Sequence, residues 1–344
     1  MNYEVTIGIP VYNVEKYVRE SLESALAQTF PSIEFLVCDD CGTDHSIDIV
    51  RDLQQNHPRG KDIRIVRQPH NMGLGCGRNR MIAEAQGRYI YFMDADDLLS
   101  ANAIELLYRQ AKEYDADIVY GSMEKVLLYD NCKRERNADY PNMVFLEEDK
   151  FAEWVYRQYD RLQASTCNFL IKTAVYRDNH IQYKPVNYWE DFTTTLDLPT
   201  YVTKAVLLSD VTYYYICREG TMSNYQTRTH IDQAEIVQTM QAIQLLKDDS
   251  LRIAGKPYIS QRMLKLMMTC FYVVCTVLRN GDKIQPAFSR RTLRDFMRYP
   301  LPFSQICMFR MNWFQHIVLY SIGVLPPVFA ILLVRLVGKY KKLI

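Results

Sequence analysis

The stretch from residue 89 to residue 97 reads YIYFMDADD. It begins with an apolar run of the kind that forms a buried strand, and it ends in the carboxylates Asp94, Asp96 and Asp97. Adjacent carboxylates repel one another unless a cation or hydrogen-bond donors neutralise them. Mg²⁺ and Mn²⁺ prefer oxygen ligands and often take only one or two carboxylates from the protein. The stretch therefore predicts a strand that ends at a divalent-cation site, with a helix cap as the alternative.

Three similar patterns precede this strand. Short apolar runs alternate with amphipathic stretches through the first hundred residues, which is typical of βαβ units that build a parallel sheet. The expected strands are 5–11, 33–38, 63–67 and 89–93, and the expected helices are 15–28, 46–55 and 77–86. This order predicts an α/β, Rossmann-like, mostly parallel sheet flanked by helices.

Polar segments follow each expected strand. Ligands of open α/β sheets bind beyond the carboxyl ends of the strands, so these segments should converge. Asp39 and Asp40 could accept a hydrogen bond from a uracil imide or a ribose hydroxyl, and Tyr12 could stack on a base. Taken singly, the aspartates also fit a turn with Gly42, and Tyr12 fits a packed aromatic.

The glycine-rich segment at 71–78 argues against two common nucleotide-binding classes. It does not follow the first strand and lacks the G-x-G-x-x-G spacing, which disfavours a dinucleotide oxidoreductase. The chain also contains no G-x-x-x-x-G-K-[ST] motif, so a P-loop hydrolase is excluded. Arg78, just inside the following helix, is a candidate contact to a base or phosphate, or an ordinary surface arginine.

A second pair of carboxylates, Glu190 and Asp191, lies far from the first in sequence. If the site transfers a group to a hydroxyl with inversion of configuration, a base is needed on the acceptor side, and this pair is the candidate. A helix cap is the alternative for the same residues.

Composition divides the chain into two parts. From residue 251 onward, 15 Lys and Arg stand against two Asp, a net charge of +13, so the first 250 residues carry −12. A basic, Met- and aromatic-rich tail suits an anionic membrane or nucleic acid, and the apolar run at 317–334 favours the membrane. Because Pro326-Pro327 interrupts that run, an interfacial or re-entrant segment fits better than a straight span. A buried helix hairpin is the alternative.

The N-terminus and the cysteines bear on the compartment. No secretory signal pattern is present at Met1, and nine irregularly spaced cysteines fit free thiols in a reducing cytosol. Cys38 and Cys41 form a C-x-x-C motif, but no second pair follows, so a zinc or redox role is disfavoured.

Taken together, the strand-end segments resemble one enzyme family. They are PVYNVE at 10–15, QTF at 28–30, DDCGTD at 39–44, NMGLGCGRN at 71–79 and DADD at 94–97. In this order they resemble the inverting family 2 glycosyltransferases of the GT-A fold, of the type that builds bacterial surface polysaccharides. The resemblance covers roughly the first 225 residues. Cys41 and Cys76 depart from the small residues usual there, and neither departure removes a reacting group.

The resemblance implies roles for individual residues. Nucleotide contacts would come from Pro10, Tyr12, Glu15, Asp40, Arg78, Asp94 and Ala95. Asp96 would bind Mg²⁺ or Mn²⁺, Asp191 would be the catalytic base, and Trp189 and Glu190 would lie on the acceptor side. Arg218 and Ser223 would lie on a loop near the diphosphate.

We therefore expect a metal-assisted, inverting glycosyltransferase that moves a sugar from a nucleotide sugar, with UDP as the expected nucleotide, to a surface polysaccharide or lipid-linked glycan. The catalytic domain would span 1–225, with a nucleotide-binding half at 1–100 and an acceptor half at 101–225. Residues 226–344 would form a helical region on the anionic inner face of the cytoplasmic membrane, with no nucleic-acid partner. A sugar nucleotidyltransferase and an inactive nucleotide-sugar-binding scaffold are the alternatives.

Overall fold

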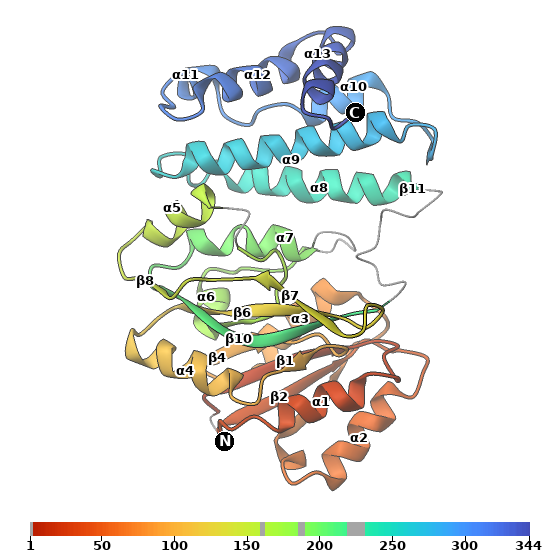
Figure 1. Cartoon of the computed structure of the whole chain (residues 1–344), viewed down its shortest axis with the longest axis vertical. Coiled ribbons are helices and arrows are strands. Elements are labelled where there is room, and N and C mark those ends of the chain that lie inside the picture. The colour runs from red at the N-terminus through yellow and green to blue at the C-terminus, as the bar shows by residue number, and fades with distance from the viewer. Residues whose placement is uncertain (1–2, 159–161, 185–189, 219–230) are drawn as a thin grey trace. The chain divides into compact units, whose positions relative to one another are not determined.

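A computed structural model of the chain describes residues 3–158, 162–184, 190–218 and 231–344. The chain forms two compact units (Figure 1). One comprises residues 1–151 and 160–222, and the other comprises residues 152–159 and 223–344. Helix α5 (Lys150–Arg157) runs from the first unit into the second.

The first unit contains a ten-stranded sheet in its described residues, ordered β3-β2-β1-β4-β9-β6-β10-β5, with β7 beside β6 and β8 beside β10. The strands are β1 (Val5–Val11), β2 (Ile33–Asp39), β3 (Ile63–Arg67), β4 (Tyr89–Phe92), β5 (Leu98–Leu99), β6 (Ile118–Leu127), β7 (Lys133–Ala138), β8 (Met143–Phe145), β9 (Phe169–Lys172) and β10 (Ala205–Cys217). Its helices are α1 (Val18–Leu26), α2 (Ser46–Asn56), α3 (Leu74–Glu84), α4 (Ala103–Glu113), α6 (Thr173–Asp178) and α7 (Glu190–Thr195).

The part of the sheet formed by the first hundred residues is parallel, as expected. Strand β1 pairs in parallel with β2 and β4, and β2 pairs in parallel with β3. Strand β2 is buried along its whole length, because helices cover both faces of such a sheet. Glu34 within it keeps its charge satisfied by Thr6 Oγ1 at 2.6 Å and Arg64 Nε at 2.8 Å. The α/β fold expected from the sequence is confirmed.

Beyond β4 the sheet becomes mixed, so the description "mostly parallel" holds for the first hundred residues. Strand β9 is antiparallel to both β4 and β6, whereas β10 is parallel to β6. Short hairpin connections such as that between β6 and β7 force antiparallel pairing, since a parallel crossover needs a dozen or more residues. Reversal of β9 places its first residue, Phe169, beside the carboxyl end of β4 and opposite Tyr120 of β6.

The second unit is helical, as the sequence predicts for the C-terminal region. It contains α8 (Gln233–Asp249), α9 (Ile259–Arg279), α10 (Arg290–Phe296), α11 (Phe303–Ile306), α12 (Trp313–Val324), α13 (Pro327–Tyr340) and a short pair, β11 (Ile231–Asp232) with β12 (Ile284–Gln285). Helix α9 packs against α8 on one side and against α12 and α13 on the other (Figure 1).

Two buried cations hold this unit together. Lys247 is fully buried and donates to the backbone carbonyls of Phe296 and Arg298 at the end of α10. Arg262, also fully buried, donates to Tyr156 Oη at 2.6 Å and to Ser250 Oγ at 2.9 Å. These contacts give each charge the hydrogen-bond partners that burial demands.

Helix α9 is the one described helix long and apolar enough to cross a membrane, and more than half of its most apolar window is buried inside the protein. The run at 317–334 forms two helices, α12 and α13, separated at Leu325 and Pro326. Proline at the start of α13 is tolerated because the first helical N–H has no intrahelical partner.

Candidate active site

The segments after β1 and β2 interlock at one edge of the first unit. Asn13 Oδ1 accepts a hydrogen bond from Thr43 N at 2.7 Å, and Asp44 Oδ2 accepts one from Glu15 N at 2.8 Å. Asn13 has a φ of 53°, and a Cβ atom on Gly42 would come within 2.9 Å of its backbone nitrogen. Glycine is therefore required at position 42. These hydrogen bonds fix the segments after β1 and β2 against each other.

The two aspartates at the end of β2 have different partners. Asp40 accepts hydrogen bonds from Met72 N at 2.8 Å and Gly73 N at 2.9 Å, so it fixes the glycine-rich segment. Asp39 accepts from Cys41 N at 2.9 Å and lies 3.5 Å from Arg67 Nε. Nothing in the sequence motifs singled out Arg67.

A hollow of about 150 Å³ opens at this edge, lined in part by Val11, Asn13, Asp39, Gly42 and Arg67. Tyr12 lies between two of its lining residues in the chain and is 43% exposed. Pro10 is paired within β1, and Glu15 Oε2 accepts from His45 N at 3.1 Å. The structure therefore brings the first group of predicted nucleotide residues to one place, although their roles stay predictions.

Arg78 is the centre of the site. The side chain extends from α3 and is only 1% exposed. Its guanidinium lies 3.6 Å from Asp94 Oδ1 and 3.2 Å from Glu190 Oε1, and it donates a short hydrogen bond to Asp191 Oδ1. Burial opposes the charge, but Asp191 and Asp94 raise the pKa of Arg78 well above its usual value. The strand-end acids and the distant Glu190–Asp191 pair therefore share one cation.

The hydrogen bonds that described residues donate to the Asp191 carboxylate all reach one of its two oxygens. Both Arg78 and Thr166 Oγ1, at 2.7 Å, donate to its Oδ1 atom. Among the described residues no hydrogen bond reaches Oδ2, and the side chain keeps 27% of its surface exposed. One carboxylate oxygen is thus held in place while the other faces away from these donors, which is the arrangement a proton acceptor needs.

Glu190 beside it is more deeply buried. Burial, together with the charge of Asp191, raises the pKa of Glu190 to about 7, while Arg78 opposes the rise. Burial likewise raises the pKa of Asp94; Arg78 opposes this, and Asp191 and Asp96 add to it. Three carboxylates, those of Asp94, Glu190 and Asp191, thus lie around the single positive charge of Arg78.

Asp96 and Asp97 point to different partners despite being adjacent. Asp96 Oδ2 lies 3.4 Å from Arg218 Nη1, and the same guanidinium lies 3.9 Å from the centroid of the Tyr17 ring. Asp97 is buried and accepts from Tyr213 Oη at 2.7 Å and Ile216 N at 2.8 Å. Asp97 therefore anchors β10, whereas Asp96, with a side chain 38% exposed, faces the site.

The acids fit a metal that shares its ligands with a substrate. The described residues hold no group of three or more His, Cys, Asp or Glu side chains able to bind a metal by themselves. Asp94 and Asp96 keep 37% and 38% of their side chains exposed, and the charge of Asp96 adds to the rise that burial causes in the pKa of Asp94. One or two such carboxylates are what Mg²⁺ or Mn²⁺ takes when diphosphate oxygens and water complete its shell.

Four remaining predicted residues complete the comparison with the sequence. Ala95 is buried between the two acids, and Arg218 contacts Asp96 as described. Trp189 and Ser223 lie outside the described residues. Thr166, which donates to Asp191, lies outside every sequence motif quoted above, so the sequence did not identify it.

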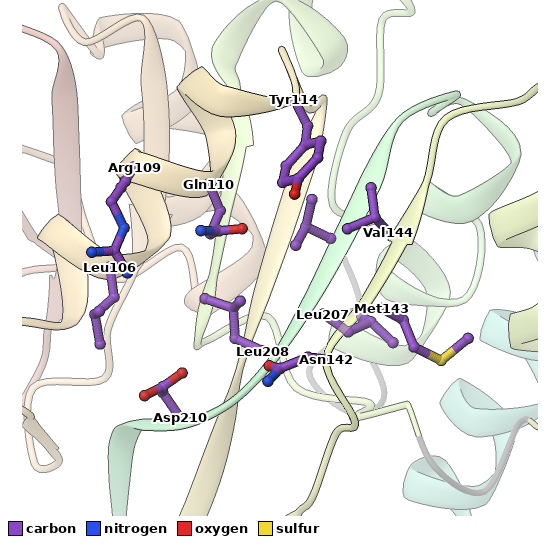
Figure 2. Close-up of a pocket in the computed structure, with 11 residues that line it drawn as sticks. Leu106, Arg109, Gln110, Tyr114, Asn142, Met143, Val144, Leu207, Leu208 and Asp210 are labelled. Carbon is purple, nitrogen blue, oxygen red and sulfur yellow. The ribbon is translucent and has the colours of Figure 1, made fainter.

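A larger hollow, about 300 Å³, lies elsewhere on the first unit. Figure 2 shows its lining: Arg109 and Gln110 from α4 on one side, and Met143, Val144 and Leu207 from β8 and β10 on the other. It shares no lining residue with the strand-end site, and the described polar groups at its rim form no cluster comparable to that around Arg78. Size alone is therefore a poor guide to the chemistry here.

The chain is similar to known glycosyltransferases in sequence. The family model for Glycosyl transferase family 2 matches residues 6–179. Glycosyltransferase GlyG of Streptococcus pneumoniae is 28% identical over 64% of this chain and 73% of its own length. Poly(ribitol-phosphate) beta-glucosyltransferase of Bacillus spizizenii is 28% identical over 62% of this chain but only 32% of its own length.

Solved structures agree on the fold. S. aureus TarS residues 1–349, in complex with UDP-GlcNAc, superimposes with a TM-score of 0.65 at 19% identity and covers 93% of this chain and 90% of its own. Mannosyltransferase PcManGT from Pyrobaculum calidifontis, in complex with GDP-Man and Mn²⁺, gives a TM-score of 0.52 at 13% identity over 94% and 88% of the two chains. The chain belongs to glycosyl transferase family 2 and is a glycosyltransferase with the GT-A fold.

Proposed function

We propose that this glycosyltransferase moves a sugar from a UDP-sugar to a hydroxyl of a surface polysaccharide or lipid-linked glycan, with inversion. The observation that carries the proposal is the Arg78 centre, which joins Asp94 at the end of β4 to Asp191 at the start of α7. A donor-side acid and a candidate base thereby flank one buried cation. The printed names of a poly(ribitol-phosphate) glucosyltransferase and a TarS complex with UDP-GlcNAc support a polymer acceptor and a UDP-sugar donor.

Asp191 would act as the catalytic base. Its Oδ1 atom is held by Arg78 and Thr166, so Oδ2 is left to take the proton of the acceptor hydroxyl. The hydroxyl oxygen then attacks the anomeric carbon from the side opposite the diphosphate. The bond from that carbon to the diphosphate oxygen breaks, UDP leaves with the electron pair, and the proton remains on Asp191. A single displacement of this kind inverts the anomeric configuration.

The nucleotide would bind at the ends of β1 and β2. Tyr12 is exposed enough to stack on a base, and Asp39 borders the adjoining hollow with Arg67. Asp40 acts on the same site indirectly, because both its carboxylate oxygens hold the segment that leads into α3. Pro10 is paired with Cys38 in the sheet and Glu15 donates its backbone N–H to Asp44, so both would shape this edge. Ala95, buried between Asp94 and Asp96 in the chain, keeps its predicted role near the nucleotide.

Asp96, with help from Asp94, would hold Mg²⁺ or Mn²⁺. When bound, the metal supplies Lewis-acid stabilisation of the charge that develops on the departing diphosphate. Arg218 contacts Asp96 and would interact with phosphate oxygens in the same region. Trp189, Glu190 and Ser223 keep their predicted roles on the acceptor side and near the diphosphate.

The enzyme would work in the cytoplasm, at the inner face of the cytoplasmic membrane, where lipid-linked acceptors are presented. The basic C-terminal part, +13 from residue 251 onward, suits an anionic lipid surface and no nucleic acid is required. The nucleotidyltransferase alternative loses ground to the family assignment. The activity test below distinguishes an active enzyme from the inactive-scaffold alternative.

The test compares Asp191→Asn with Asp178→Asn, an exposed aspartate on α6. We expect Asp191→Asn to lower metal-dependent hydrolysis or transfer of a UDP-sugar by about 100-fold or more, the usual contribution of a general base. The same UDP-sugar should still raise the melting temperature, since ligand binding stabilises the folded state. The Asp178→Asn protein should match the wild type.

A panel of UDP-, GDP-, dTDP- and CMP-sugars, with and without Mn²⁺, identifies the donor. Stabilisation by one UDP-sugar that needs Mn²⁺ and disappears in Asp96→Ala supports the proposed metal site. Folded protein that none of these donors stabilises, or an Asp191→Asn variant with full activity, contradicts the proposal.

A further inference from the structure

Helix α13 carries an apolar stripe that faces away from the protein. Phe329, Leu332, Leu336 and Tyr340 are 60%, 56%, 69% and 88% exposed. Their spacing of three or four residues places them on one side of an α-helix, one above the other. A single exposed apolar residue needs no explanation, but a continuous row over the length of a helix is a typical binding surface. We call these four residues the α13 stripe.

The opposite side of α13 already provides the packing that the fold needs. Ala330, Ile331, Val334 and Gly338 are buried. A Cβ atom on Gly338 would come within 3.2 Å of Cys275 Sγ, which shows how closely α13 lies against α9. The helix is therefore apolar on two opposite sides, and only one of them serves the interior of the second unit.

Positive charge surrounds the stripe. Residues 327–344 contain Arg335, Lys339, Lys341 and Lys342 and no acidic residue. Arg335 and Lys339 are exposed on α13 itself, and Lys341 and Lys342 follow directly. Long basic side chains can lie along an apolar surface while their charged ends reach a polar layer. Apolar and cationic groups on one exposed helix face match the two layers of an anionic lipid surface.

The length of the helix decides between lying on a bilayer and crossing it. Helix α13 has 14 residues, about 21 Å at 1.5 Å per residue. The hydrocarbon core of a bilayer is about 30 Å thick. Trp313 and Phe314, at the start of α12, are also exposed, at 50% and 71%. Tryptophan, with an apolar ring and a polar N–H, prefers the boundary between lipid and water.

We infer that α13 lies in the surface of an anionic lipid membrane, with the α13 stripe inserted and Arg335 and Lys339 at the level of the lipid headgroups. This inference rests on the proposed function only for the presence of a membrane-borne acceptor; the donor and the catalytic base play no part in it. Vesicle binding therefore tests it without any substrate.

The experiment is flotation of the full chain with vesicles of equimolar phosphatidylglycerol and phosphatidylcholine, and with vesicles of phosphatidylcholine alone. We expect the wild type to float with the anionic vesicles and less with the neutral ones. The double variant Leu332→Gln and Leu336→Gln should bind at least about tenfold more weakly, because each side chain loses its apolar transfer free energy. Leu251→Gln, which changes a leucine of similar exposure, 52%, in the same unit, should bind like the wild type.

A second variant removes charge without touching the apolar side chains. Arg335→Gln with Lys339→Gln should weaken binding to anionic vesicles by several-fold and leave binding to neutral vesicles unchanged. This variant keeps the test valid if the leucine variant fails to fold. UDP-sugar hydrolysis without vesicles, measured on the same proteins, should remain at the wild-type level, so loss of membrane binding is distinguished from loss of the proposed activity.

Three outcomes overturn the inference. The first is a wild type that does not float with anionic vesicles. The second is flotation of both double variants that equals flotation of the wild type. The third is a wild-type dimer by light scattering that the leucine variant converts to a monomer, with no vesicle binding by either; a second copy of the chain would then cover the α13 stripe.

Discussion

Replacement of Glu190 by glutamine should stabilise the protein at high pH and leave it unchanged at low pH. The pKa of Glu190 is raised from 4.5 to about 7, first by burial and then by the charge of Asp191. The unfolded chain therefore ionises this carboxyl at a lower pH than the folded chain does. Stability falls as pH rises from about 4.5 to about 7, because folding there requires uptake of a proton.

The magnitude follows from the size of the rise. One pKa unit corresponds to about 1.4 kcal/mol, so ionisation of Glu190 costs the folded state about 3 kcal/mol. Glutamine has nearly the same shape and can still accept from Arg78 through its amide oxygen, but it carries no charge. For a unit of this size, about 3 kcal/mol corresponds to roughly 6 to 12 °C in melting temperature.

The assay is a thermal melt of the wild type, Glu190→Gln and Glu147→Gln at pH 5 and pH 8. The Glu147 side chain is exposed, so its substitution controls for the loss of a charge as such. Glu190→Gln should melt close to the wild type at pH 5 and several degrees higher at pH 8. An equal difference between the two proteins at both pH values would refute the argument that burial holds this proton.

Three other substitutions test the fold. Gly121→Ala should destabilise the first unit by about 2 to 4 kcal/mol in a denaturant titration, because its Cβ atom would come within 1.9 Å of Thr212 Oγ1. Lys247→Met should lower the stability of the second unit by about 1 to 3 kcal/mol, since two buried carbonyls lose their charged donor. Burial lowers the pKa of His316 to about 4. The unfolded chain therefore binds this proton at a higher pH than the folded chain, and the protein loses stability as pH falls from about 6.5 to about 4. His316→Gln should reduce this loss, measured as the difference in melting temperature between pH 7 and pH 4.5.

The fold of the first hundred residues could be predicted from the sequence because local patterns determine it. Parallel strands buried on both faces read as unbroken apolar runs, and β1, β2, β3 and β4 lie within a residue or two of the expected ranges. The acids after β4 and the segment before α3 could also be identified as candidate site residues from local patterns. Each lies where a periodic pattern stops, and the topology of a parallel sheet brings such points together.

The fold of the first unit beyond residue 100 could not be predicted in the same way. Thr166 contacts Asp191 only because β9 runs antiparallel and brings its beginning to the edge where β4 ends. Pairing direction between distant strands leaves no mark on the local sequence. The contact between Arg78 and Asp191, which are 113 positions apart, is likewise tertiary; the sequence identified both residues but not that they share a hydrogen bond.

The separate roles of Asp96 and Asp97 show the same limit. The sequence presents them as one acidic cluster, and a metal was expected for the group. Burial and partner choice divide them, since Asp97 gives both oxygens to β10 and Asp96 keeps its face toward the site. Only the fold decides which of two neighbouring carboxylates holds structure and which can bind a ligand.

The hydrogen bonds between Asp97 and the end of β10 also limit where this enzyme can be joined to a relative in a chimaera. A chimaera joined before Ile216 would separate the acidic run from the strand that it holds, and would require the foreign strand to present a phenol and a backbone N–H in the same positions. A junction at Ile231, where the described helical region begins, leaves these partners on one parental sequence. Exchange of C-terminal regions at that position therefore keeps the contacts of Asp97 intact, but the foreign helices must still offer a partner to Tyr156, which binds the buried Arg262.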